Sequence, residues 1–290
     1  MSPESGIALA RLTTIGTGGD AHAFAKVTTE SELEAAVRWA AEREMEVVPI
    51  GLGSNVLAAD DGVDALVVRL EGALAGVEID GRVLSAGGGA SNAVCLHRAR
   101  AAGLGGFEFA CAIPGTAGGG VWMNAGAYGS DWKAILVRAL VTSVDGTGWL
   151  TADELGLEYR RSGLRPGHVV ARVEYELEPR PVDEIKATVA ELVARRKATQ
   201  PTNKRTFGSV FKNPAGELGA GRMLELCGLK GHRIGGATIS PRHANFIENA
   251  GGATSADCLA LMAEARHRAR EQFGVELEHE VVLLGGLMLP

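Results

Sequence analysis

The chain has 290 residues, of which 46% are hydrophobic and 22% charged, and its formal net charge is -6 at pH 7. This is the balance of a globular protein with room for two or three compact units, and it excludes an overall basic field that would hold nucleic acid. The N-terminal MSPESGIALARL lacks a basic start, and no segment reaches about 20 uninterrupted apolar residues. We therefore expect a cytoplasmic protein with no nucleic-acid or membrane partner.

In chain order, the hydrophobic pattern of the first half predicts two helices, two strands and a hairpin. Thr29 and Glu32 have the spacing of a capping box, and apolar residues follow at helical intervals. The further elements are strands at 47–50 and 64–70, a hairpin around Asp80-Gly81 at 77–89, and a helix at 91–103 that ends at Gly103.

The second half mixes the two types of element again. Segment 110–129 has no clean period and predicts a loop around a short helix. The elements after it are strands at 135–144 and 168–177 linked through the Asp145-Gly146 turn, a helix that ends near Lys197, a helix at 255–272 and a strand at 276–286. Because strict βαβ alternation is absent, the pattern predicts an α+β fold and disfavours a doubly wound sheet.

The cysteines and histidines are scattered along the chain. Cys95, Cys111, Cys227 and Cys258 form no CxxC pair, and the seven histidines show no metal-ligand spacing. We expect buried thiols in a reducing compartment and no metal site.

Two glycine-rich segments are candidates for holding phosphate, in a chain with 40 glycines. GTGGDA at 16–21 nearly meets the dinucleotide-binding pattern, but HAFAKV follows it and predicts a strand where that pattern requires a helix. GLGSN at 51–55 directly follows an apolar strand and offers successive backbone N–H groups with Ser54 and Asn55. PGTAGG at 114–119 adds the Thr116 hydroxyl. Together the two segments favour a large phosphate-bearing cofactor.

Five motifs follow one another in an order that resembles one enzyme family. They are GLGSNVLAADDG (51–62), IPGTAGGGVWMNAGAYG (113–129), YRRSGL (159–164), GSVFKNP (208–214) and LEHEVVLLG (277–285). The chain resembles the UDP-N-acetylenolpyruvoylglucosamine reductases, FAD enzymes that complete the synthesis of UDP-N-acetylmuramate for peptidoglycan. The resemblance runs from about residue 12 to residue 285.

The resemblance implies a domain organisation and a cofactor. We expect a two-part FAD-binding region of the vanillyl-alcohol-oxidase-like (PCMH-type) kind, with subdomains at 1–71 and 72–198 and a returning strand at 275–290. A C-terminal α+β substrate-binding domain takes up 199–274, and the protein is expected to be a monomer. The residues expected to bind FAD non-covalently are Gly51, Leu52, Gly53, Ser54, Asn55, Pro114, Gly115, Thr116, Gly118 and Gly119.

The resemblance also implies a reaction. In this family NADPH reduces the flavin and leaves, and hydride then passes from flavin N5 to the enolpyruvyl group of the sugar nucleotide. Arg160, Ser209 and Glu280 match the catalytic residues. A guanidinium suits the enolate-like charge that builds next to the substrate carboxylate, and a hydroxyl can protonate the basic carbon. Glu280 is expected to be protonated or paired with Arg160 in the complex.

Further matches concern the substrate. Tyr128, Lys212 and Asn213 fall where the family contacts substrate, whereas His243 and Asn245 are left without a role. The chain departs from the common pattern at Ala112, Thr199 and Val282. Only 48 residues separate Arg160 from Ser209, too few for the tyrosine-bearing substrate loop of the longer subtype, so the chain resembles the shorter subtype.

Two alternatives stay open from the sequence. One is a flavoprotein oxidase or dehydrogenase, in which FAD is often tethered covalently. Cys111 borders the second loop, but no histidine lies in 45–62 or 110–129. The other is a flavin-binding module without turnover, in which no substrate would oxidise the reduced flavin.

Overall fold

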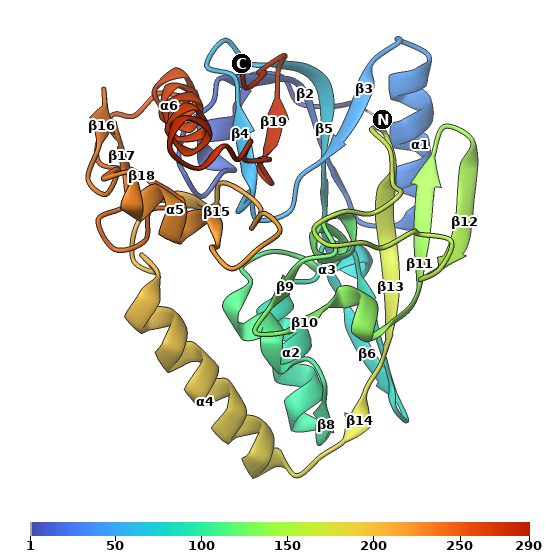
Figure 1. Cartoon of the computed structure of the whole chain (residues 1–290). Coiled ribbons are helices and arrows are strands. Elements are labelled where there is room, and N and C mark those ends of the chain that lie inside the picture. The colour runs from blue at the N-terminus through green and yellow to red at the C-terminus, as the bar shows by residue number, and fades with distance from the viewer. Residues whose placement is uncertain (1) are drawn as a thin grey trace. The chain divides into compact units, whose positions relative to one another are not determined.

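The computed structural model describes residues 2–290, which divide into two compact units (Figure 1). Unit 1 comprises the N-terminal residues as far as Ser5, Ala23–Leu52 and Asp64–Arg195. Unit 2 comprises Gly6–His22, Gly53–Val63 and Arg196–Pro290. Each unit is therefore assembled from segments that are distant in the sequence, and the glycine segment 51–55 passes from one unit into the other after Leu52.

The first layer of unit 1 contains α1 (Glu30–Ala41) and strands β3 (Glu46–Pro49) and β5 (Val63–Leu70), as the hydrophobic pattern predicted. The Thr29 side chain accepts a hydrogen bond from the Glu32 N–H and so begins the helix. β3 pairs in parallel with β5, and the Ala23–Val27 part of β2 (Asp20–Val27) lies on the other side of β5. The observed strand β2 confirms that GTGGDA does not open a dinucleotide-binding helix.

A five-stranded antiparallel sheet in unit 1 has the order β12-β11-β13-β7-β6. Its strands are β6 (Val77–Asp80), β7 (Val83–Gly87), β11 (Leu136–Ser143), β12 (Gly146–Thr151) and β13 (Val169–Glu176). The expected link from β11 to β13 through the Asp145-Gly146 turn is wrong in detail, because this turn joins β11 to β12 with Ser143 opposite Gly146. β12 lies on the sheet edge and most of its side chains are exposed. It therefore lacks the alternation of apolar and polar residues by which a strand is predicted from sequence.

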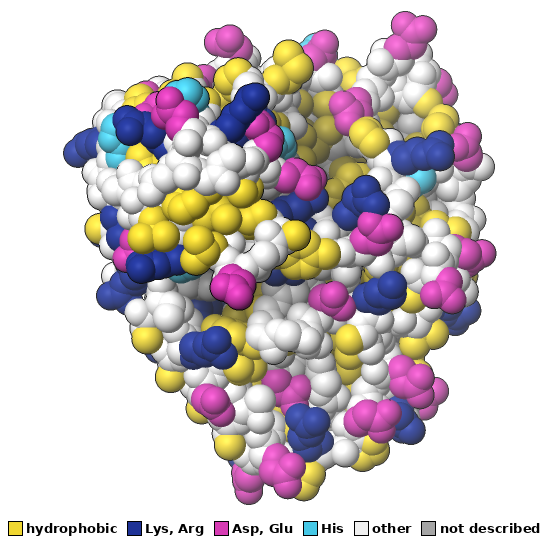
Figure 2. All heavy atoms as spheres, in the orientation of Figure 1, with side chains coloured by type: hydrophobic (Ala, Val, Ile, Leu, Met, Phe, Trp, Pro, Cys, Tyr) yellow, Lys and Arg dark blue, Asp and Glu magenta, His cyan; other side chains and the backbone are white. Residues whose placement is uncertain are grey.

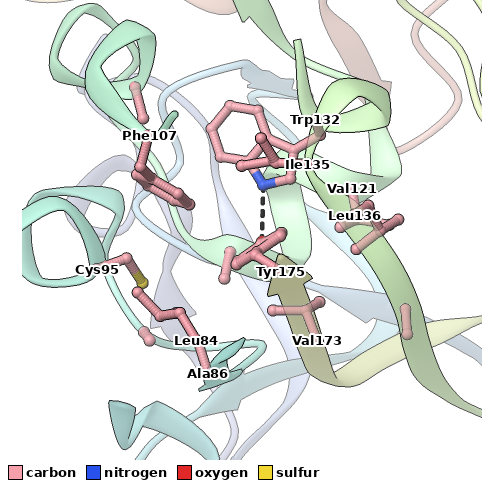
Figure 3. Close-up of a cluster of buried hydrophobic side chains, with 14 of the residues drawn as sticks. Leu84, Ala86, Cys95, Phe107, Val121, Trp132, Ile135, Leu136, Val173 and Tyr175 are labelled. Carbon is pink, nitrogen blue, oxygen red and sulfur yellow. Dashed lines mark hydrogen bonds between the residues drawn. The ribbon is translucent and has the colours of Figure 1, made fainter. Parts of the chain in front are cut away.

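Helices α2 (Asn92–Ala101) and α3 (Ala117–Trp122) pack on this sheet, and Gly103 follows α2 with φ 69° as expected. Figure 3 shows the core between them, in which Trp132 Nε1 donates a hydrogen bond to Tyr175 Oη at 2.7 Å. Burial raises the pKa of Tyr175 well above its usual value and that of Cys95 to about 12. The core thus anchors Trp132 in the middle of the irregular segment between α3 and β11.

Unit 2 contains a four-stranded antiparallel sheet with the order β15-β18-β17-β16. Its strands are β15 (Thr206–Ser209), β16 (Arg233–Ile234), β17 (Ala237–Ile239) and β18 (Phe246–Asn249). Helix α6 (Ser255–Phe273) packs against β16 and β17, as Figure 1 shows. The helix buries Cys258, and this burial raises the pKa of the thiol to about 12. The expected helix at 255–272 is thereby confirmed.

The expected single strand at 276–286 is wrong, because this segment pairs with two different partners. Residues 278–280 lie against 210–212, and only β19 (Val282–Leu284) is a strand, parallel to β4 (Val56–Ala58). An apolar run alone does not reveal such a change of partner.

The remaining elements are short, except for α4, which reaches two residues beyond the expected end at Lys197. They are β1 (Ile7–Ala8), η1 (Leu9–Arg11), η2 (Gly72–Ala75), β8 (Leu104–Gly105), η3 (Glu108–Ala112), β9 (Gly126–Ala127), β10 (Ser130–Asp131), η4 (Trp132–Ala134), β14 (Glu178–Pro179), α4 (Val182–Thr199) and α5 (Ala220–Leu226). On the face drawn in Figure 2, basic and acidic side chains are interspersed. Within residues 2–290, no helix has the length and apolar character needed to cross a membrane.

Candidate active site

Arg160 lies in unit 1 at the third position of a tight turn. Glu158 and Arg161 close this turn by exchanging two backbone hydrogen bonds of 2.9 and 3.1 Å. Arg160 has φ 55°, in the left-handed region that favours glycine or asparagine at such a position. A large side chain held there stores backbone strain, which is typical of functional sites.

The half-buried Arg160 side chain is directed by its surroundings. Its Nη2 donates a hydrogen bond to Gly126 O at 2.6 Å, and its guanidinium carbon lies 5.1 Å from the centre of the Tyr159 ring. Since Gly126 belongs to the segment that the buried Trp132 anchors, the guanidinium is tied to a rigid part of unit 1.

Ser209 and Glu280 lie on neighbouring segments of unit 2. Glu280 N donates to Val210 O at 2.9 Å, and Phe211 pairs with His279 in an isolated bridge. Both Ser209 and Glu280 are half-buried, and Ser209 ends β15 opposite Phe246. The structure therefore brings together two of the three expected catalytic residues within one unit, although 70 positions separate them.

Two asparagines hold this pair of segments in place. Asn245 is 4% exposed; its Oδ1 accepts from Phe211 N at 2.9 Å and its Nδ2 donates to Phe211 O at 2.8 Å. Asn55 Nδ2 donates to Glu280 O at 2.8 Å, and Asn55 O accepts from Val282 N at 3.0 Å. Asn245 received no role from the sequence, and Asn55 was assigned only to the cofactor. Their positioning roles depend on contacts between distant segments, for which no local pattern exists.

Replacing Asn245 by alanine is expected to destabilise the protein strongly. Phe211 is 1% exposed, and the substitution leaves both its N–H and its C=O without a partner, at about 1–3 kcal/mol for each group. Urea denaturation measures the change in the free energy of unfolding. Thr238→Val in β17 is the matched control, because it removes more exposed hydroxyl contacts and is expected to cost on the order of 0.5 kcal/mol. Equal losses in the two variants would contradict the role given to Asn245.

Gly51 and Thr116, one from each glycine segment expected to bind the cofactor, meet in unit 1. A Cβ at Gly51 would lie 2.6 Å from Thr116 Oγ1, so only glycine permits this approach. At Gly53, in unit 2, a Cβ would lie 2.0 Å from Leu12 O, and φ is 62°. Within residues 2–290, Gly51, Leu52 and Gly53 donate no backbone–backbone hydrogen bond, so their successive N–H groups are available to an anion.

The second segment offers similar features. Thr116 caps α3 by accepting from Gly119 N at 3.4 Å, and in the described part of the chain the N–H groups of Gly115 and Thr116 donate no backbone–backbone hydrogen bond. Asn92 donates through Nδ2 to Ile113 O and through its N–H to Gly115 O, and its buried Oδ1 has no partner among residues 2–290. An orphaned acceptor and unpaired amides fit a ligand that carries phosphates and N–H or hydroxyl donors, as FAD does.

The expected substrate contacts all have partners within the protein. Tyr128, with φ 55°, donates its hydroxyl proton to Leu192 O at 3.2 Å. Lys212 Nζ pairs with Glu278 Oε1 at 2.5 Å, and Asn213 Oδ1 accepts from Ala220 N at 3.0 Å. Glu278 takes only one of the three donors of Lys212, and the substrate contacts of Tyr128, Lys212 and Asn213 stay predictions.

Cys111, which borders the second loop, is half-buried and packs against the core of unit 1. Cys227 is half-buried as well, whereas Cys95 and Cys258 are buried. The expectation of buried thiols is therefore confirmed for Cys95 and Cys258 and is wrong for the other two cysteines. In the described part of the chain, no group of three or more His, Cys, Asp or Glu side chains is arranged to hold a metal ion.

Comparisons with known proteins place these features in a family. Residues 21–150 match the model of an FAD binding domain, and residues 200–284 match the C-terminal domain of UDP-N-acetylenolpyruvoylglucosamine reductase. A reductase of that name from Anaeromyxobacter dehalogenans is 45% identical over 277 residues, which cover 96% of this chain and 84% of the relative. One from Rubrobacter xylanophilus is 42% identical over 279 residues, 96% of this chain and 93% of the relative.

A solved structure agrees with these matches. The crystal structure of UDP-N-acetylenolpyruvylglucosamine reductase from Thermus caldophilus is 36% identical, with a TM-score of 0.86 over 98% of this chain and 100% of that one. The expected fold class, an FAD-binding region followed by a C-terminal α+β domain, is thereby confirmed.

Proposed function

Because the chain belongs to the UDP-N-acetylenolpyruvoylglucosamine reductase family and is an FAD-containing oxidoreductase, we propose that it reduces the enolpyruvyl group of UDP-N-acetylglucosamine enolpyruvate. The product is UDP-N-acetylmuramate, a precursor of peptidoglycan, and NADPH is the reductant. We place the reaction in the cytoplasm. The observation that carries the proposal is the pairing of the Ser209 and Glu280 segments through the Glu280 N–H.

The cofactor would be held by the two glycine segments, 51–55 and 114–119. In the described part of the chain, the N–H groups of Gly51, Leu52, Gly53, Gly115 and Thr116 donate no backbone–backbone hydrogen bond and suit its diphosphate. Gly51 also approaches Thr116 closely, which places the two segments side by side there. When bound, FAD takes up hydride from NADPH and supplies it to the substrate double bond.

Ser209 donates the proton in this proposal. Addition of hydride next to a carboxylate leaves a strongly basic carbon, which a hydroxyl can protonate without an activating histidine. Ser209 suits this task because it is half-buried at the end of β15, where Asn245 holds Phe211 in the segment that follows.

Arg160 and Glu280 stabilise the charge that appears before the proton arrives. The forked donors of Arg160 match the substrate carboxylate, and they act more strongly on the enolate-like transition state than on the ground state. Glu280 helps to polarise the substrate double bond when it is protonated or paired with Arg160. An ionised and unpaired Glu280 carboxylate would instead repel the carboxylate of the substrate. Tyr128, Lys212 and Asn213 are proposed to contact the sugar nucleotide.

Stopped-flow absorbance tests the proposal directly. The FAD enzyme is first reduced with one equivalent of NADPH without oxygen and is then mixed with the enolpyruvyl sugar nucleotide. We expect the absorbance of oxidised flavin to return, with one UDP-N-acetylmuramate formed per flavin.

UDP-N-acetylglucosamine, which lacks the enolpyruvyl group, is the matched control and should leave the flavin reduced. No return of absorbance with either compound would instead favour a flavin-binding module without turnover. Reduction of the flavin by an alcohol or hydroxy acid would favour an oxidase or dehydrogenase.

A further inference from the structure

Asn124, in the NAGAYG motif, is among the most constrained polar residues of unit 1. It follows α3, is 1% exposed and has φ 37°, in the left-handed region. Both functional atoms of its side chain are engaged. Oδ1 accepts from Lys133 N at 2.9 Å, whereas Nδ2 donates to Glu158 O at 2.9 Å and lies 3.3 Å from Asp131 Oδ2.

These bonds join the end of α3 to the turn that carries Arg160. Glu158 opens this turn, and its carbonyl oxygen receives the Asn124 Nδ2 proton two residues before Arg160. Two further bonds flank this contact, from Lys133 Nζ to Leu157 O at 3.1 Å and from Ser162 Oγ to Trp122 O at 2.6 Å. Arg160 itself reaches back to Gly126 O. Asn124 is the buried centre of this set of bonds.

We propose that Asn124 is a positioning residue for the reduction of substrate, which acts by holding the Glu158–Arg161 turn so that the Arg160 guanidinium meets the developing charge. The inference rests on the function proposed for Arg160. Neither the sequence motifs nor the family match assigns Asn124 a task, and its side chain is fully occupied by protein groups.

Asparagine is suited to this position for two reasons. It offers an acceptor to Lys133 N and a donor to Glu158 O from one short side chain, and it tolerates a left-handed backbone. Aspartate has nearly the same shape but no donor, and it would direct a carboxylate oxygen at Glu158 O and Asp131 Oδ2. Catalytic geometry is sensitive to such changes, since a misplacement of about 1 Å can cost about 10²-fold in rate.

Asn124→Asp is expected to slow oxidation of the reduced flavin by substrate about 10²-fold. Reduction of the flavin by NADPH and the KM for the sugar nucleotide should change little, which is a pattern that a general loss of structure would not give. Asn124→Gly keeps the left-handed backbone accessible and serves if the aspartate variant does not fold. Thr142→Val is the matched control, because it removes a buried hydroxyl contact with Thr147 elsewhere in unit 1 and should leave both half-reactions unchanged.

A double-mutant cycle with Arg160→Ala decides whether Asn124 acts through Arg160. In the Arg160→Ala background, the further effect of Asn124→Asp should shrink to less than about 3-fold, because the group being positioned is gone. An undiminished effect in that background would overturn the positioning role. If Arg160→Ala alone left substrate reduction unchanged, the function proposed for Arg160 would fail first, and the inference with it.

Discussion

Replacing Ser209 by alanine is expected to separate the two half-reactions. Reduction of the flavin by NADPH should stay at the wild-type rate, because no proton from Ser209 is needed there. Oxidation of the reduced flavin by the enolpyruvyl sugar nucleotide should slow by about 10²–10⁴-fold or more, the range of general acid catalysis. Stopped-flow absorbance of each half-reaction measures both effects on one sample.

Ser240→Ala provides the control for this experiment. Ser240 is a fully buried serine of the same unit, and its Oγ accepts only from Arg242 N, at 3.2 Å, in the described part of the chain. The Ser240→Ala variant also loses a serine hydroxyl from unit 2, but the rates of both half-reactions should stay close to those of the wild type. If Ser209→Ala behaved like Ser240→Ala, Ser209 would not be the proton donor.

The elements that could be predicted from the sequence are those with complete local signals. Thr29 begins α1 through its own side chain, and Asp80-Gly81 forms the turn between β6 and β7 with Asp80 opposite Val83. β12 was missed because an exposed edge strand buries too little to alternate clearly. The strand expected at 276–286 was wrong because the partner changes from 210–212 to β4 within the segment.

The same distinction applies to the candidate site. Ser209, Glu280 and Arg160 could be found because the motifs around them are long and follow a known order. Asn124, Asn55 and Asn245 position their segments through bonds that span 34, 225 and 34 positions of the chain, and no short motif encodes such a span. The side chains of Asn124 and Asn245 each give and accept a hydrogen bond at once in a confined place, which asparagine allows, whereas the side chain of Asn55 donates one to Glu280 O.

The requirement for these asparagines has a physical origin. Parts of the candidate site are irregular segments, whose backbone N–H and C=O groups lack regular helix or sheet partners. Asn245 replaces a missing strand neighbour for Phe211, and Asn55 does so for Glu280. The side-chain amides of Asn245 and Asn55 thus hold irregular segments of the candidate site in place.

Arg160→Ala is expected to reduce turnover by about 10²–10³-fold, the usual loss when a donor to a developing anion is removed. The KM for the sugar nucleotide should rise much less, because the guanidinium acts mainly on charge that exists only in the transition state. Steady-state kinetics with NADPH, together with the single-turnover oxidation of reduced flavin, measure the two effects. Loss of affinity alone would mean that Arg160 only binds substrate.

The backbone of Arg160 adds a second result to the same experiment. Arg160→Gly and Arg160→Ala lose the same guanidinium and the same bond to Gly126 O, so both should lose the same factor in turnover. At φ 55°, however, alanine keeps the left-handed strain of roughly 1–2 kcal/mol that glycine does not have. The glycine variant should therefore unfold at the higher urea concentration.

Arg161→Ala is the control for both results, because Arg161 is exposed and its pair with Glu158 is a surface contact of small worth. It should keep turnover and stability close to those of the wild type. If the glycine and alanine variants of Arg160 were equally stable, the turn would not be strained in solution. The left-handed backbone would then be a consequence of the guanidinium contacts of Arg160.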